Sequence, residues 1–138
     1  MSLKVIKKFE IRRIEILSQS GKCDEKLKPK LSNEDIKKLY EWMIFTRIFD
    51  QKAFSLQRTG RLGTYPQKQG QEATIIGTGY AMDKEDWLFP SFRESGAMAL
   101  LGVDPVLLLQ YFGGDERGQK IPEDVNVFPI TITVGAQP

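Results

Sequence analysis

The chain has 138 residues, of which 41% are hydrophobic and 28% are charged, and its formal net charge is +2. This length and balance suit one globular domain with a real core, and no run approaches the eighteen or so apolar residues of a membrane span. The first residues resemble no secretory signal. We therefore expect a cytoplasmic protein that does not enter a membrane.

Histidine is absent from the chain, and Cys23 is the single cysteine. These counts exclude a histidine general base, an internal disulfide and a conventional zinc site within the chain. Acid–base chemistry would have to come from carboxylates, from a cofactor or from a partner protein. We therefore expect the chain alone to be inactive as an enzyme.

The amino-terminal region is basic, because residues 1–30 contain nine Lys and Arg against four acidic residues, whereas residues 31–138 contain eleven against fourteen. We interpret residues 1–30 as an arm and linker and residues 31–138 as the folded domain. For residues 1–17 the apolar pattern leaves strand and helix open. Their basic residues are not clustered with stacking aromatics, which favours a solvated or partner-packed arm over nucleic-acid binding.

A long helix is predicted after Ser32, because Ser32 and Asp35 have the spacing of a capping box. Apolar residues between Ile36 and Phe49 cover more than one stripe of this helix, so we expect it to be covered on two sides. It would then lie in the centre of the domain or at a subunit interface. Thr59–Gly60 marks its end, since glycine accepts the left-handed conformation of a helix C-cap.

Two polar loops flank the next predicted elements. A loop over residues 60–70 leads into a helix that begins at Gln71–Glu72 and ends near Ala81, and a short buried strand follows over residues 87–89. Residues 91–94 form the second loop at the end of that strand, where ligands collect in open α/β sheets. Arg93 is therefore a candidate binding residue. Glu72 is interpreted as a carboxylate that favours the helix N-terminus rather than as a catalytic group, and Gly77 and Gly79 as sites of tight packing.

The last third of the chain is predicted to contain two helices and a strand. The first helix lies within residues 96–102. Asp104 then offers an N-cap with proline at the next position, which begins a helix that ends at Gly113–Gly114. A polar, mobile loop is predicted over residues 115–124, and β-branched residues indicate a strand over residues 125–134.

In this order and at these separations, the residues resemble the alpha subunit of thiamine-diphosphate-dependent 2-oxoacid dehydrogenases, the decarboxylating component of the pyruvate and branched-chain complexes. The resemblance covers about residues 32–138. Its matching segments are Tyr65–Pro66, Gly70–Ala73, Asp86–Glu94, Gly113–Gly114 and 126–137. The resemblance implies an α/β fold: part of a thiamine-diphosphate-binding Rossmann-like fold with a helical amino-terminal region.

The resemblance also implies positions for the cofactor. Arg93 would contact the diphosphate, where a planar cation suits a polyanion. Phe92, at a position where many relatives have tyrosine, would pack beside the same cofactor. The backbone at Ile132 and Val134 would flank the aminopyrimidine. The resemblance places no catalytic residue and no metal ligand in this chain, and Ala136 departs from the potassium-binding pattern of branched-chain relatives.

The expected partners are a beta subunit in an α2β2 tetramer, which carries the activating glutamate, and the lipoyl acyltransferase core of the complex. The Gly-Asp-Gly and asparagine that hold magnesium in this family would lie beyond residue 138, so the chain is expected to be the amino-terminal portion of a subunit. The segment around Tyr65 and Glu72 favours pyruvate as substrate, and Phe92–Glu94 favours a branched-chain 2-oxoacid; pyruvate is preferred narrowly. A non-catalytic oligomerisation or interaction domain is the alternative.

Overall fold

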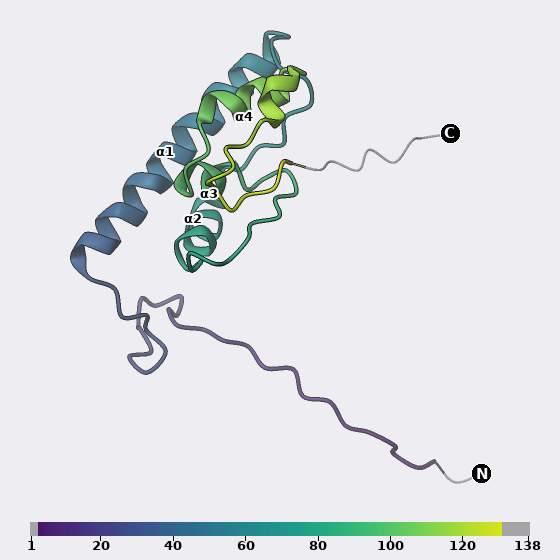
Figure 1. The fold of residues 1–138 in the computed structure, drawn as a ribbon. Coiled ribbons are helices and arrows are strands. Elements are labelled where there is room, and N and C mark those ends of the chain that lie inside the picture. The colour runs from purple at the N-terminus through teal and green to yellow at the C-terminus, as the bar shows by residue number, and fades with distance from the viewer. Residues whose placement is uncertain (1–2, 131–138) are drawn as a thin grey trace. The chain divides into compact units, whose positions relative to one another are not determined.

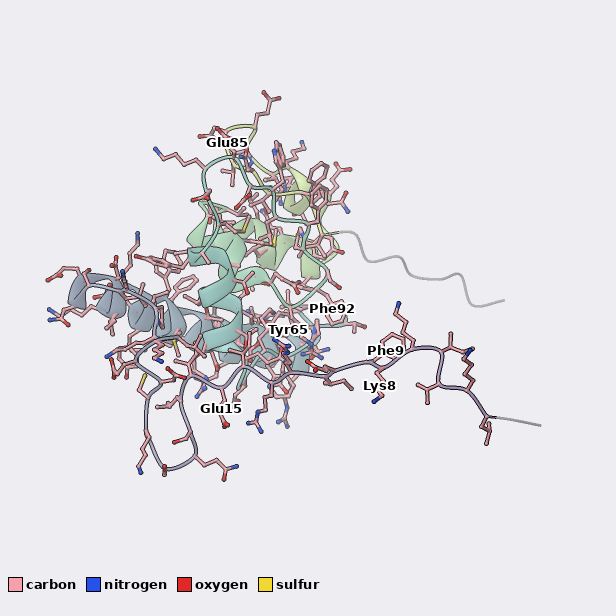
Figure 2. The ribbon with its side chains drawn as sticks, turned by 90° about the horizontal axis from the view of Figure 1, so that it is seen from below. Lys8, Phe9, Glu15, Tyr65, Glu85 and Phe92 are labelled. Carbon is pink, nitrogen blue, oxygen red and sulfur yellow. The ribbon has the colours of Figure 1, made fainter. Side chains whose placement is uncertain are left out.

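The computed structural model describes residues 3–130, and the chain divides into two units, Met1–Ser32 and Asn33–Pro138, each of which is described by itself. In the first unit, Lys8 and Phe9 project from an extended stretch of backbone (Figure 2). A single antiparallel bridge, Leu17 to Cys23, closes a turn in which Gly21 has a φ of +80°. Over residues 3–15 the backbone forms neither the strand nor the helix that the sequence left open.

The second unit begins with the long helix α1 (Asn33–Arg58), whose predicted start after Ser32 and end before Gly60 are confirmed. Gly60 has a φ of +73°, the left-handed conformation expected after a helix. One face of α1 is buried by other parts of this unit. Another face, which carries Ile36, Tyr40, Ile44 and Ile48, is exposed. Of the two predicted alternatives, a helix in the centre of the domain is therefore not found within the described residues, and a position at a subunit interface stays a prediction.

Three shorter helices lie along one side of α1 (Figure 1). They are α2 (Glu72–Tyr80), α3 (Ser95–Leu100) and α4 (Pro105–Phe112), and a 3-10 helix, η1 (Glu116–Gln119), follows them. Both α2 and α3 pack on α1 and on each other, and α4 contacts α3 and η1. The apolar core lies between these elements, and its buried members include Phe49, Ala53, Tyr65, Met98, Leu108 and Phe112.

Small residues allow the helices to approach closely. A Cβ at Gly96 would lie 2.4 Å from Thr46 Oγ1 of α1, and one at Gly79 would lie 3.0 Å from the Ala97 Cβ. The predicted role of Gly79 in tight packing is thus confirmed. The same prediction for Gly77 is wrong, because a Cβ there would meet no atom within 4 Å.

The predicted strand over residues 87–89 is not formed. Trp87 and Phe89 are 51% and 69% exposed, so the segment is not buried as expected. Leu88 makes one parallel bridge to Val127, with the Leu88 amide donating to the Asn126 carbonyl and the Phe128 amide to the Leu88 carbonyl, both at 2.9 Å. A parallel sheet needs both of its faces covered. Here the Phe89 and Phe128 rings stack on each other with centroids 4.2 Å apart, and Phe89 remains exposed, so this side of the segment is not covered. The regular secondary structure within residues 3–130 is thus helical, with no strand longer than a bridge, which corrects the α/β expectation for the described part.

The end of the described chain follows the sequence prediction in part. The Asp104 carboxylate caps α4 by accepting from the Val106 amide at 2.8 Å, and Pro105 begins the helix, as predicted. The loop expected over residues 115–124 instead contains η1, whose Gly118 packs so closely on Tyr111 that a Cβ would clash with its backbone. None of the helices in residues 3–130 combines the length and apolarity that crossing a membrane requires.

Candidate functional site

A pocket of about 390 Å³ lies between α2, the loop that ends at Glu94, and α3. Its apolar wall includes Ile75 of α2 and Ala97 of α3. Phe92 and Arg93 stand on the loop side, and Phe92 is 40% exposed; Figure 2 labels the Phe92 side chain. A mainly apolar hollow with a few convergent polar groups is the usual form of a small-molecule site.

The loop that carries these two residues is held in shape by its own carboxylate. One oxygen of Glu94 accepts hydrogen bonds from the backbone amides of Ser91, at 2.9 Å, and of Arg93, at 3.0 Å. The Glu94 carbonyl then accepts from the Met98 amide as α3 begins. Glu94 thus binds the backbone of its own loop and forms no ion pair with the neighbouring Arg93 side chain within the described residues.

The Arg93 guanidinium reaches across to the preceding loop and donates to the backbone carbonyl of Gln67. It also lies 5.4 Å from the centre of the Phe92 ring. No carboxylate in residues 3–130 lies within 4 Å of this guanidinium, as an ion pair would require. A guanidinium has five N–H donors and a permanent charge. Arg93 therefore presents an unneutralised cation, oriented by one hydrogen bond, at the edge of the pocket.

The loop that supplies the Gln67 carbonyl is anchored by a buried polar cluster. Asp50 of α1 accepts from the Tyr65 hydroxyl at 3.0 Å and from the backbone amides of Lys68 at 2.9 Å and Gln69 at 3.2 Å. The Lys68 ammonium donates to the Tyr65 hydroxyl at 2.6 Å and lies 4.0 Å from the Asp50 carboxylate. Burial lowers the pKa of Lys68 to about 8, an effect that Asp50 opposes and Arg93 reinforces. Burial and Asp50 together raise the pKa of Tyr65.

The junction between this loop and α2 is fixed by Glu72. Its buried carboxylate forms an ion pair with Arg47 of α1 and accepts from the Gly70 amide at 3.0 Å. The hydrogen bond from Arg47 lowers the pKa of Glu72 to about 2. Gly70 has a φ of +91°, a conformation that an L side chain rarely adopts. The carboxylate is fully engaged in holding the helix start, in keeping with the structural role that the sequence indicated.

Two of the four predicted site residues, Phe92 and Arg93, thus meet at one pocket. The other two, Ile132 and Val134, lie outside the described residues, as do the positions compared with the potassium loop. The sequence prediction missed Asp50 and Lys68 and the pairing of Arg47 with Glu72. The available signal for Asp50 was its position on the apolar face of α1, between Phe49 and Ala53, where a charged residue needs a partner.

The chemical character of the pocket suits an anion. Its polar groups include the Arg93 cation, the amide of Gln71 and the hydroxyls of Thr74 and Thr78, which can all donate hydrogen bonds. The Glu94 carboxylate also lines the pocket, and one of its oxygens is occupied by the Ser91 and Arg93 amides. Over residues 3–130 no group of three or more His, Cys, Asp or Glu is placed to hold a metal ion. The described residues therefore fit a phosphate group and offer no metal site of their own.

Comparison with known proteins gives a family and a set of relatives. Residues 40–138 match the family described as the dehydrogenase E1 component. The chain is 37% identical over 124 residues to the pyruvate dehydrogenase E1 component subunit alpha of Bacillus subtilis (strain 168), an alignment that covers 89% of this chain and 33% of that protein. The alpha subunit of Staphylococcus aureus (strain Mu50 / ATCC 700699) is 37% identical over 131 residues, 94% of this chain and 35% of the relative.

A third relative, the alpha subunit of Mycoplasma pneumoniae (strain ATCC 29342 / M129 / Subtype 1), is 35% identical over 138 residues, 99% of this chain and 38% of that protein. The chain thus spans about a third of the length of the curated relatives that it matches. The family match begins within α1 and includes the Phe92–Arg93 pocket. On these grounds the chain belongs to the dehydrogenase E1 component family.

Proposed function

We propose that this chain is the amino-terminal portion of the alpha subunit of a thiamine-diphosphate-dependent 2-oxoacid dehydrogenase. Acting with a beta subunit, the subunit oxidatively decarboxylates pyruvate and transfers the acyl group to a lipoyl group. The observation that carries the proposal is the Arg93 cation, which has no carboxylate partner in residues 3–130 and stands beside an aromatic side chain at a largely apolar pocket. The names of the similar proteins support the choice of pyruvate.

The pocket fits one end of the proposed cofactor. Arg93 would bind the diphosphate through charge-assisted hydrogen bonds, with its guanidinium kept in orientation by the Gln67 carbonyl. Phe92 and Ile75 would cover the neighbouring part of the cofactor and exclude water, which strengthens the electrostatic attraction. When bound, thiamine diphosphate supplies the carbanion chemistry by which a 2-oxoacid loses carbon dioxide.

Other parts of the site are assigned to groups outside the described residues. The backbone at Ile132 and Val134 is proposed to flank the aminopyrimidine, and the magnesium ligands are proposed to follow residue 138. The beta subunit of an α2β2 tetramer would contribute the activating carboxylate, consistent with a sequence that contains no histidine. The acyl group would pass to the lipoyl acyltransferase core. In the assembled subunit we propose an α/β fold around the cofactor.

Substrate preference is tested by co-expressing the complete alpha subunit that contains this chain with its beta partner. Carbon dioxide release is then measured from pyruvate and from 3-methyl-2-oxobutanoate. We expect the higher kcat/KM with pyruvate. A higher value with the branched substrate would transfer the assignment to the branched-chain enzymes, and release from neither substrate in the presence of thiamine diphosphate and Mg²⁺ would contradict the proposal.

A second candidate function, self-association without catalysis, is favoured by the exposed apolar residues Ile36, Tyr40, Ile44 and Ile48 on one face of α1. Residues four apart on a helix lie on the same face, so these side chains form a stripe that a second copy of the chain could cover. Light scattering of the purified chain would detect such a dimer. A monomer at high micromolar concentration would argue against this function.

A further inference from the structure

The loop over residues 65–69 connects a buried polar cluster, which consists of Asp50, Tyr65 and Lys68, to the candidate site. At one side, Asp50 holds its backbone amides and the Tyr65 hydroxyl. At the other side, the Gln67 carbonyl of the same loop accepts from the Arg93 guanidinium. Gln67 lies between the anchored residues Tyr65 and Lys68, so the direction of its carbonyl depends on the anchor.

The anchor is built as a closed set of hydrogen bonds in the interior. Asp50 is 1% exposed and Lys68 is also 1% exposed, although charged residues are rarely buried unless they are paired. The Tyr65 hydroxyl donates to Asp50 and accepts from the Lys68 ammonium, so it joins the two charges. The ammonium also lies 3.9 Å from the centre of the Tyr65 ring and 5.4 Å from that of Phe112.

Removing any one of the three side chains would leave another buried polar group without its hydrogen-bond partner. An unpaired buried polar group costs free energy, so the cluster favours the single arrangement in which all three are paired. The Lys68 charge also interacts with the Arg93 charge. The Arg93 charge is one of the causes that lower the pKa of Lys68, so the two cations are close enough to repel each other. Two of the three groups that donate to Asp50 are backbone amides, so Asp50 holds the loop backbone as well as a side chain.

We propose that Asp50, Tyr65 and Lys68 are positioning residues for Arg93: they hold the 65–69 loop so that its Gln67 carbonyl aims the guanidinium at a bound diphosphate group. They touch neither the ligand nor the reacting atoms, and act through Arg93. The ligand part of this inference rests on the function proposed above. The part that concerns the order of the Arg93 side chain rests on the hydrogen bonds alone.

Tyr65→Phe is the first test, because it deletes the bridging hydroxyl and keeps the ring that packs edge-to-face on Phe112 at 4.9 Å. In the full chain, ¹⁵N relaxation of the Arg93 Nε should show a clear fall in order parameter in this variant, and Lys68→Met should show the same. Val103→Ala is the matched control, since it removes volume from the same core without deleting a polar contact. An Arg93 order parameter unchanged in both loop variants would overturn the proposal.

A double-mutant cycle separates positioning from general destabilisation. Calorimetric titration with pyrophosphate should show about fivefold weaker binding for Tyr65→Phe, and no further loss when Tyr65→Phe is added to Arg93→Ala. A full additional loss in the Arg93→Ala background would contradict action through Arg93. If the unmodified chain bound no pyrophosphate, the proposed function would fail in this form of the protein, while the relaxation measurement would still decide the positioning role.

Discussion

Replacing Lys68 with methionine should remove a pH-dependent component of stability. The side chain is buried, and burial lowers its pKa from 10.5 to about 8. Between these two values the unfolded chain binds more protons at this residue than the folded chain does. The free energy of unfolding therefore rises with pH across this window, and the contribution of Lys68 is least favourable below pH 8.

The size of the effect follows from the same values. From pH 7 to pH 9.5, the difference in proton binding at Lys68 raises the free energy of unfolding by about 2 kcal/mol, at about 1.4 kcal/mol per pKa unit. Measurements should stop at pH 9.5, because the raised pKa of Tyr65 acts in the opposite direction once unfolded tyrosine begins to ionise above that pH. Methionine has a similar length and no titrating group, so the variant lacks the Lys68 contribution.

The assay is urea unfolding followed by circular dichroism at half-unit steps from pH 7 to pH 9.5. We expect the stability of the unmodified chain minus that of Lys68→Met to increase by about 2 kcal/mol over this range. Lys52→Met is the matched control, because Lys52 is an exposed lysine on α1, the helix that carries Asp50. A difference between Lys68→Met and the unmodified chain that stayed constant with pH would refute the account of a desolvated ammonium at this position.

Three further substitutions test the packing around the site. Glu72→Gln should lower the free energy of unfolding by about 1 kcal/mol at pH 7. It should also reduce the loss of stability that occurs as the pH falls from 4.5 to 2, because the ionised Glu72, whose pKa is lowered in the fold, contributes its full stabilisation only above that range. Acid unfolding checks this, with the exposed Glu85→Gln as the control. Gly96→Ala should lower the melting temperature, since its Cβ would approach Thr46 Oγ1 to 2.4 Å. Gly77→Ala should instead stabilise by about 0.5–1 kcal/mol, because the site has open space on an exposed helix face, and a lower melting temperature there would contradict the packing described.

The helices could be predicted because their ends depend on neighbouring residues. The N-cap of α4 is an aspartate followed by proline, and α1 is followed by a glycine with positive φ, so each signal lies within two or three residues of the feature that it determines. The strands could not be predicted in the same way. Residues 87–89 have a suitable composition, but a strand requires a partner from elsewhere, and among residues 3–130 this segment forms only the Leu88–Val127 bridge.

The candidate site shows the same contrast between residues that are neighbours in the sequence and contacts that join distant residues. Phe92 and Arg93 are adjacent in sequence; Arg93 was expected to bind because it follows the predicted strand, and Phe92 because of the family resemblance. The strand is not formed, but both residues line the pocket, and their binding role stays a prediction. The contacts that hold the site join residues far apart in the chain: Arg47 pairs with Glu72 across 25 positions, and the Lys68 amide binds Asp50 across 18. In both pairs the end of α1 and the loop after it lie between the two residues, so no period along a single element could indicate the contact.

The most direct test of the proposed function is the affinity for thiamine diphosphate in the presence of Mg²⁺, measured by calorimetry on the subunit assembled with its beta partner. Arg93→Ala should weaken this affinity at least tenfold, because it removes charge-assisted hydrogen bonds worth roughly 1.5–3 kcal/mol. Arg61→Ala, which removes an exposed arginine from the neighbouring loop, should leave the affinity unchanged. Equal affinities for the unmodified protein and Arg93→Ala would contradict the assignment of Arg93 to the diphosphate.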